Sequence, residues 1–183
     1  MGALLVNFLG GDRGPWRVER VDTIIGDGLE PVPFVEVVEG WAAPVPASTW
    51  SLRGVVSNDR YLQADEKARL AATQEGLGRA AATRAALIPI RKNEAWWTLT
   101  QAERRDILET TSRHIAIGLD YLPAIARRLH HGRDLNEPFD FVTWFEFAPE
   151  EEPAFDELVS RLRATEEWSY VDREVDIRLA LTP

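Results

Sequence analysis

Four phenylalanines and a threonine alternate strictly with other residues around position 143, and no other feature constrains the fold of this chain as strongly. Side chains two residues apart lie on the same face of a strand, so a period of two is typical of β-structure. The run therefore predicts a strand over residues 139–147. Its aromatic face consists of Phe139, Phe141, Thr143, Phe145 and Phe147.

A helix is predicted to begin at Thr100, well before this strand. Thr100 and Glu103 have the spacing of a capping box, in which each side chain bonds to the backbone N–H of the other residue. Residues on one face then recur at three- and four-residue steps, the period of a helix packed against a core. His114 is seven residues after Ile107, so it is expected on this buried face. The residues of the face are Ile107, Leu108, Thr111, Ile115 and Leu119.

A second helix is predicted from Pro123 to Gly132. Proline suits the first turn of a helix, where its missing N–H costs little, and glycine is a good left-handed cap at the other end. This helix would carry Arg127 and Arg128.

The remaining segments give strand and helix patterns in both halves of the chain. Helices are expected at about 62–83, where alanine is frequent, and from Pro153, where apolar residues share one face. A short buried strand at 86–90 is expected to be broken by Pro89. The strands alternate in polarity, which favours an α+β fold with a mostly antiparallel sheet and helices on one face. The other expected strands are 3–8, 18–25, 31–40, 50–56 and 173–181.

Composition excludes several classes of function. The 183 residues contain no evident linker, which fits one compact unit. The net charge of -9 argues against nonspecific nucleic-acid binding, and an anionic substrate would need a local cation in a pocket. The absence of cysteine excludes thiolate catalysis, disulfides and cysteine-based zinc sites. No apolar run is long enough to span a membrane, and the N-terminus lacks a basic region, so a cytoplasmic location is expected.

Three stretches resemble one known family. They are WSLRGVVSNDRY at 50–61, ALIPIRKNEAWW at 86–97 and SRHIAIGLDYLPAIARRLHHGRDLNEPFDFVTWFEFAP at 112–149. Together they resemble the short, dimeric bacterial branch of the chlorite dismutases, and the similarity extends over nearly all of the chain from about Gly10. The resemblance implies two ferredoxin-like halves that form a dimeric α+β barrel. The whole chain, 1–183, would be one unit, with a shorter half at about 1–85 and a haem-binding half at about 86–183.

The resemblance makes His114 the proximal ligand of a haem b. From pattern alone, a lone histidine on an apolar helix face is more often a packed core residue. Composition narrows the choice, because the chain has three histidines, no cysteine and no methionine after Met1, so a haem ligand must be histidine or, less often, tyrosine. The resemblance also assigns Glu167 as the acceptor of the second imidazole N–H, with Lys92 in the same network. By sequence alone, Glu167 reads instead as a solvated loop carboxylate.

On the distal side, the resemblance assigns a mobile arginine to Arg127. Arginine stays protonated and offers several donors in a fixed fork, which suits an anionic substrate. Its neighbour Arg128 is expected to be exposed or in a salt bridge. Gln74 matches the position that hydrogen-bonds the distal arginine, although an ordinary surface glutamine fits the sequence nearly as well.

The expected haem surroundings are aromatic. Residues with an apolar body and one polar group suit the propionate edge of a haem, although core packing explains the two tryptophans equally well. Phe145 is expected to wall the distal pocket. The adjacent His130 and His131 would not face one another on a helix, so they are expected in solvent or at an interface. The propionate candidates are Asn58, Tyr61, Trp96 and Trp97.

The function implied by the resemblance is conversion of chlorite to chloride and dioxygen. Ferric haem would take one oxygen from chlorite, giving a ferryl species and hypochlorite that recombine, while Arg127 holds the anion. A homodimer is the implied assembly. The alternatives are a coproheme decarboxylase of the same fold, which lacks the distal arginine, a dye-decolourising peroxidase, whose motif is missing, and a haem-binding or haem-sensing protein without turnover.

Overall fold

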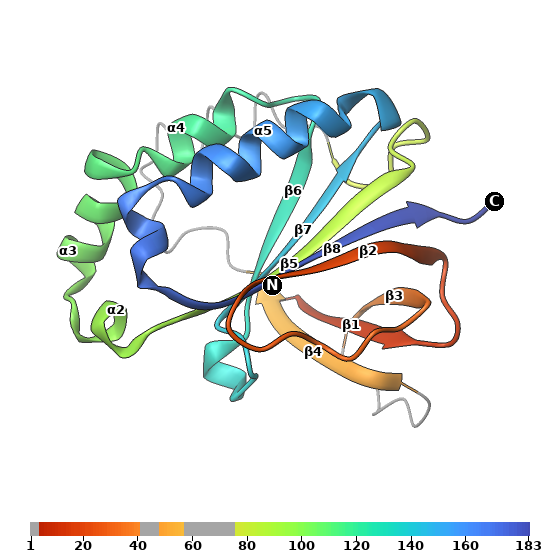
Figure 1. Cartoon of the computed structure of the whole chain (residues 1–183), viewed down its shortest axis with the longest axis horizontal. Coiled ribbons are helices and arrows are strands. Elements are labelled where there is room, and N and C mark those ends of the chain that lie inside the picture. Colours follow the sequence, from red (N-terminus) through yellow and green to blue (C-terminus); the bar gives the residue numbers. More distant parts are fainter. Residues whose placement is uncertain (1–3, 41–47, 57–75) are drawn as a thin grey trace.

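The computed structural model of the chain describes residues 4–40, 48–56 and 76–183, drawn in colour in Figure 1. In these residues eight strands close into an antiparallel barrel in the order β1-β3-β2-β8-β5-β7-β6-β4. The strands are β1 (Leu5–Gly11), β2 (Trp16–Ile25), β3 (Phe34–Glu39), β4 (Ser48–Val56), β5 (Arg84–Lys92), β6 (Ala126–His131), β7 (Phe141–Phe147) and β8 (Val171–Leu181).

The ladders around the barrel differ greatly in length. β1 pairs along its whole length with β4 and from Val6 to Gly11 with β3, and β8 pairs over most of its length with β2 and β5. By contrast, β2 and β3 share two residue pairs, Trp16–Val35 and Arg17–Phe34. β4 and β6 also share two, Val55–His131 and Val56–His130. The barrel is thus a three-stranded sheet and a five-stranded sheet joined along two narrow seams.

One hydrophobic core fills the inside of the barrel. Large side chains from both sheets meet there, and their burial favours closure at about 25 cal/mol per Å² of apolar surface. The indole of Trp144 stacks 5.9 Å from the ring of Phe8 and meets Trp16 edge-on at 5.3 Å. Each of these three residues comes from a different strand, so the core draws both sheets together.

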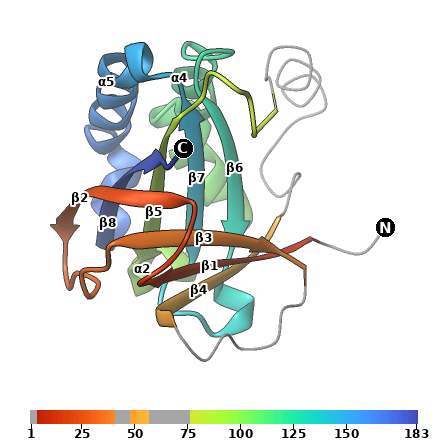
Figure 2. The same cartoon turned by 90° about the vertical axis from the view of Figure 1, so that its right-hand side faces the viewer.

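Helices cover the outer face of the five-stranded sheet, and in both views α4 and α5 lie along one side of β5 to β8 (Figures 1 and 2). A second core lies between α5 and the sheet, where Phe155 stacks 4.6 Å from Phe147. The helical segments are α2 (Glu94–Thr98), α3 (Gln101–Arg105), a π-helix (Asp106–Thr111), α4 (His114–Leu119), α5 (Glu152–Arg163) and three 3-10 turns (Arg133–Leu135, Pro149–Glu151 and Glu166–Tyr170). No helix in the described part of the chain is long and apolar enough to cross a membrane.

The predicted fold class is confirmed: the structure is α+β, with an antiparallel barrel and helices on one face. The terminal strand β8 alternates as predicted, but both of its faces are buried from Glu174 to Ala180. Its polar face lies under α5, where Arg163 bonds to Glu174 at 2.7 Å and to Asp176 at 2.9 Å. Alternation in this strand therefore separates two buried layers.

The helix predicted from Pro123 to Gly132 is wrong, because residues 126–131 form strand β6. The local signals suited a helix, but β6 gains six residue pairs with β7, and tertiary pairing outweighs a weak local preference. The strand places Arg127, Leu129 and His131 on the helix-covered face and Arg128 and His130 on the opposite face.

Four smaller predictions also need correction. The helix from Thr100 has the predicted capping box but ends after five residues, passes into a π-helix and restarts at His114. Residues 76–83 are not helical, and the rest of that predicted helix lies largely outside the described residues. Pro89 does not break its strand, which runs from Arg84 to Lys92, and Phe139 precedes β7.

His130 and His131 were expected in solvent or at an interface, and the solvent alternative is wrong, because their exposed fractions are 0% and 7%. His130 packs edge-on against Phe8 inside the barrel, at 4.9 Å between ring centroids. Its Nδ1 lies 2.8 Å from the carbonyl of Val142, and its Nε2 accepts from Arg128 Nε at 3.1 Å. These partners hold a neutral imidazole, and burial lowers the pKa of His130 to about 4.

Replacing His130 with glutamine should flatten the pH dependence of stability. The unfolded chain takes up a proton below about pH 6.5, whereas folded His130 does so only near its lowered pKa, so stability falls as the pH drops between these values. Relative to His130→Gln, the wild type should lose roughly 2–3 kcal/mol of unfolding free energy between pH 7 and pH 4. Urea denaturation at several pH values measures this difference. Equal changes of unfolding free energy with pH in the two proteins would contradict the prediction.

Candidate functional site

His114 lies where the backbone changes direction between two helical segments. The π-helix ends at Thr111, Arg113 adopts a left-handed conformation with φ of 53°, and α4 begins with His114. The side chain of Glu109 caps the new helix by accepting the N–H of Ile115 at 3.0 Å. π-helical turns and left-handed non-glycine residues concentrate at functional sites, because such conformations must be held by the surrounding structure.

The structure brings His114, Glu167 and Lys92 together in one hydrogen-bonded chain. His114 Nδ1 lies 2.6 Å from Glu167 Oε2, and Lys92 Nζ donates to Glu167 Oε1 at 2.8 Å. Glu167 and Lys92 are 4% and 5% exposed, so the reading of Glu167 as a solvated loop carboxylate is wrong. His114 belongs to α4, Glu167 to the turn Glu166–Tyr170 and Lys92 to β5.

Electrostatics keep this carboxylate ionised. Burial alone would raise the pKa of Glu167, but the charges and hydrogen bonds of His114 and Lys92 lower it to about 2. The backbone N–H of Glu167 also donates to Ser112 Oγ at 3.0 Å. Glu167 is therefore a fixed acceptor that orients the His114 ring and determines which ring nitrogen carries the proton.

Aromatic rings surround the Lys92 ammonium group. It lies 4.6 Å from the ring centroid of Trp96 and 5.5 Å from that of Trp168. Trp168 stacks near His114 at 6.4 Å and donates its Nε1–H to Glu174 at 2.7 Å. Sequence reasoning did not single out Trp168, and its position beside Glu167 in the chain was the available signal.

Arg127 lies on the helix-covered face of β6, directly across the ladder from Phe145. Its guanidinium reaches α4, because a Cβ added at Gly118 would lie within 3 Å of three guanidinium atoms. Gly118 is one helical turn after His114, so Arg127 approaches the helix that carries the histidine. Burial lowers the pKa of Arg127 from its usual value and the carboxylate of Glu109 opposes that shift, while an arginine stays protonated at neutral pH.

The neighbours of Arg127 have separate environments. Arg128, on the opposite face, forms an ion pair with Glu39 at 2.7 Å, which agrees with the expected salt bridge. Phe145 is 5% exposed and meets Phe155 of α5 edge-on at 5.0 Å, so it belongs to the second core while sharing a face with Arg127.

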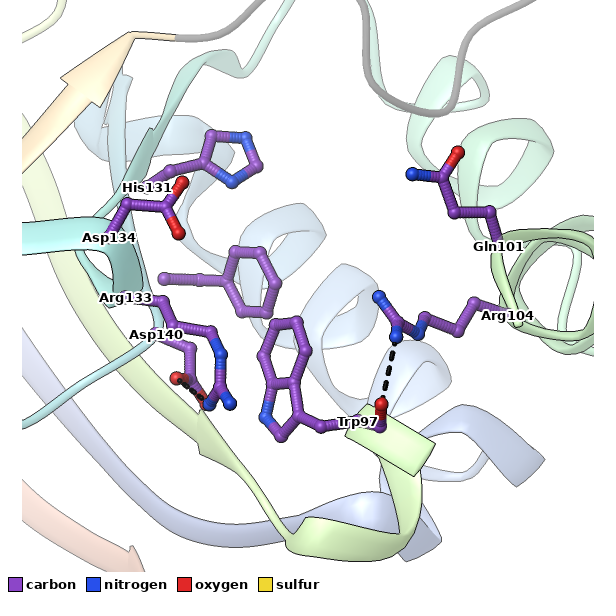
Figure 3. A pocket seen from close by; sticks show the side chains of 8 residues that line it. Trp97, Gln101, Arg104, His131, Arg133, Asp134 and Asp140 are labelled. Atoms are coloured by element: carbon purple, nitrogen blue, oxygen red, sulfur yellow. Dashed lines mark hydrogen bonds and ion pairs between the residues drawn. The ribbon is translucent and has the colours of Figure 1, made fainter. Parts of the chain in front are cut away.

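A pocket of about 410 Å³ opens at the other end of this face (Figure 3). Arg133 lies over the indole of Trp97, with its guanidinium carbon 3.8 Å from the ring centroid. Arg104 donates to the carbonyls of Trp96, Trp97 and Leu99, which fixes the end of α2. The lining residues are Trp97, Gln101, Arg104, His131, Arg133, Asp134, Asp140 and Phe141.

Asp140 links this pocket to the Lys92 network. It is 5% exposed, accepts the backbone N–H of Lys92 at 2.7 Å and pairs with Arg133 at 3.2 Å. The sequence analysis missed Arg133 and Asp140, because an Asp seven positions after an Arg forms no recognisable motif. Three predicted residues, Asn58, Tyr61 and Gln74, lie outside the described part of the chain.

Comparison with known proteins identifies relatives. The model of the family described as chlorite dismutase matches residues 42–181. Chlorite dismutase of Ideonella dechloratans is 34% identical over 100 residues, which are 54% of this chain and 34% of that protein. The matched part thus spans about a third of that curated relative.

Solved structures extend the likeness over the whole chain. The crystal structure of a dimeric chlorite dismutase from Nitrobacter winogradskyi is 55% identical, covers 97% of this chain and 99% of its own, and superposes with a TM-score of 0.90. The chlorite dismutase of Candidatus Nitrospira defluvii in complex with imidazole is 19% identical, covers 98% of this chain and 91% of its own, and has a TM-score of 0.72. At 19% identity, the similarity to this second structure shows a shared fold alone.

Proposed function

Because the chain belongs to the chlorite dismutase family, we propose that it binds haem b through His114 and converts chlorite to chloride and dioxygen. The observation that carries the proposal is the partly buried hydrogen bond between His114 Nδ1 and Glu167. A histidine that ligates a metal through one nitrogen commonly donates its other N–H to a carboxylate, which orients the ring and raises its basicity. The bond to Glu167 leaves the Nε2 atom of His114 for iron.

Two further features fit a haem. In the part of the chain that the structure describes, the indole N–H groups of Trp96 and Trp97 are buried without a hydrogen-bond partner. Such donors suit an anionic carboxylate such as a haem propionate, because a buried unpaired N–H is costly. Leu129, between Arg127 and His131 on the same face of β6, is 38% exposed and offers an apolar contact.

When bound, haem b supplies the iron at which oxygen leaves chlorite and is joined to a second oxygen. The residues of the chain perform the remaining tasks. Glu167 keeps the proton on His114 Nδ1, and Lys92 holds Glu167 in place. Arg127 binds the chlorite anion and retains the hypochlorite released from it, which a chain of net charge -9 cannot do through its overall field. The aromatic face around Phe145 excludes water and so strengthens that interaction.

A haem-binding protein without turnover would use the same His114 and Glu167. The position of Arg127 on the helix-covered face of β6, near the helix that carries His114, favours the enzyme, because a haem carrier needs no cation there to bind an anion. The same arginine argues against a coproheme decarboxylase. Oxygen evolution from chlorite by the purified haem-loaded protein distinguishes turnover from binding alone.

Arg127→Ala should keep its haem but lose about 100-fold in kcat/KM for chlorite, since removal of one charged donor from an enclosed site has an effect of that order. Escaping hypochlorite should also bleach the haem after fewer turnovers. The measurement is oxygen yield per haem, with and without methionine as a hypochlorite scavenger.

Arg128→Ala is the matched control, since this adjacent arginine bonds to Glu39 and His130 on the opposite face. It should retain the wild-type rate and oxygen yield. If the Arg128 variant lost turnover and the Arg127 variant did not, the anion would bind on the opposite face of β6. That result would refute the assignment of Arg127.

Glu167→Gln should raise the ferric/ferrous reduction potential of the loaded protein, because a neutral acceptor leaves the imidazole less anionic and ferric iron less stabilised. Spectroelectrochemical titration of the wild type and variant measures this shift. His114→Ala provides the reference, with loss of haem or an altered Soret band. An unchanged potential in Glu167→Gln would show that the carboxylate does not tune the ligand.

The chain is also proposed to form a homodimer, since the relative at 55% identity is a dimeric protein. Light scattering at micromolar concentration should give about twice the chain mass of 20.7 kDa. A monomer mass at that concentration would exclude a stable dimer.

A further inference from the structure

The segment that precedes β6 determines where Arg127 enters the site. The chain leaves α4 at Leu119, turns through residues 120–125 and begins β6 at Ala126. Within the turn, the N–H of Ile125 donates to the carbonyl of Tyr121 at 3.1 Å. Pro123 has no N–H to donate, so other groups must hold the middle of the turn.

Arg79 supplies that support from a distant part of the sequence. Its Nη2 donates to the carbonyl of Ala124 at 2.8 Å, and its Nη1 lies 3.3 Å from the carbonyl of Pro123. One planar guanidinium thus holds two successive carbonyls, a fork that lysine cannot reproduce. Both carbonyls are within four residues of Arg127.

Glu146 anchors the segment that carries Arg79. Its Oε2 accepts the N–H of Gly78 at 2.5 Å, and its Oε1 accepts Trp144 Nε1–H at 2.8 Å. Glu146 is 7% exposed and lies directly opposite Ala126, the residue before Arg127, in the ladder between β6 and β7. Glu146 therefore connects the two segments: its carboxylate binds the Arg79 segment, and its backbone forms the first residue pair of β6.

Strand β6 also has support that does not involve Arg79. The strand is held by six residue pairs with β7, and Arg79 belongs to neither hydrophobic core. The direction of a long side chain is more sensitive. A backbone rotation of about 10° at the strand start moves the guanidinium of Arg127 by about 1 Å, and a shift of that size costs an active site about 100-fold.

We propose that Arg79, anchored by Glu146, is a positioning residue that fixes the turn before β6 and thereby the direction of the Arg127 guanidinium. The proposal rests on the proposed role of Arg127 in binding an anion. In this role Arg79 acts through the backbone of residues 123–126 and not by contact with substrate or cofactor.

The test uses the haem-loaded protein and fluoride as an anionic probe whose binding is followed by the haem spectrum. Arg79→Ala should weaken fluoride binding about tenfold and raise the KM for chlorite more than it lowers kcat. Arg79→Lys should recover only part of the affinity, and Glu146→Gln should shift it in the same direction as Arg79→Ala. In the protein without haem, amide hydrogen exchange at residues 125–127 should become faster in Arg79→Ala.

Arg173→Ala is the matched control. Arg173 also donates to two successive backbone carbonyl oxygens, those of Asp27 at 2.7 Å and Gly28 at 2.9 Å, but it holds the loop between β2 and β3. Its loss should lower thermal stability without changing fluoride affinity. If Arg173→Ala lost as much fluoride affinity as Arg79→Ala, the effect of Arg79 would be explained by general destabilisation. That result would overturn the proposal.

A double-mutant cycle separates this inference from the proposed function. If Arg79 acts through Arg127, then Arg79→Ala should add nothing once Arg127 is alanine. Additive effects, or wild-type fluoride affinity in Arg79→Ala alone, would overturn the positioning role. Wild-type affinity in Arg127→Ala would instead remove the anion-binding role on which the inference depends.

Discussion

The buried contact of Lys92 with Glu167, extended to His114, is the interaction on which the site depends. It joins residues 75 and 53 positions apart in the sequence, and the backbone of Glu167 is bound in turn to Ser112. Removing one member of a buried ion pair typically costs 3–5 kcal/mol, because the remaining charge has no partner. The orientation of His114 and the local stability of the helical layer therefore have the same physical origin. A site of this kind is rigid because no other partner is available to its buried charges.

Strand β6 shows why a single residue step matters in this fold. Its two faces serve two layers: His130 and Arg128 belong to the barrel side, while Arg127 and Leu129 face the helices. A shift of one position would turn Arg127 to the barrel side and put Arg128 in its place on the side of the helices. The ladder with β7, where Arg127 lies opposite Phe145 and His130 opposite Val142, prevents such a shift.

Sequence alone predicted the parts of the fold whose signals are local. The alternation ending at Phe147, the capping box at Thr100 and the apolar face of α5 all correspond to observed elements. It failed at β6, where Pro123 and Gly132 are good helix boundaries but pairing with β7 decides the structure. Glu167 shows the same limit for the site. Its neighbours in the chain suggest solvent, and its true partners are distant, so only family resemblance pointed to the contact with His114.

Because its seams are narrow, the barrel responds to salt and temperature differently from the ion pairs on its surface. With two residue pairs at each seam, the sheets are held together chiefly by the packing of Phe8, Trp16 and Trp144 and their neighbours. Hydrophobic packing weakens on cooling and strengthens in sulfate or phosphate salts. Exposed ion pairs respond in the opposite sense to salt, because added ions screen them. Closure of the barrel should therefore be the cold-sensitive part of this molecule, and salting-out conditions should tighten the barrel while loosening the charged contacts on its surface.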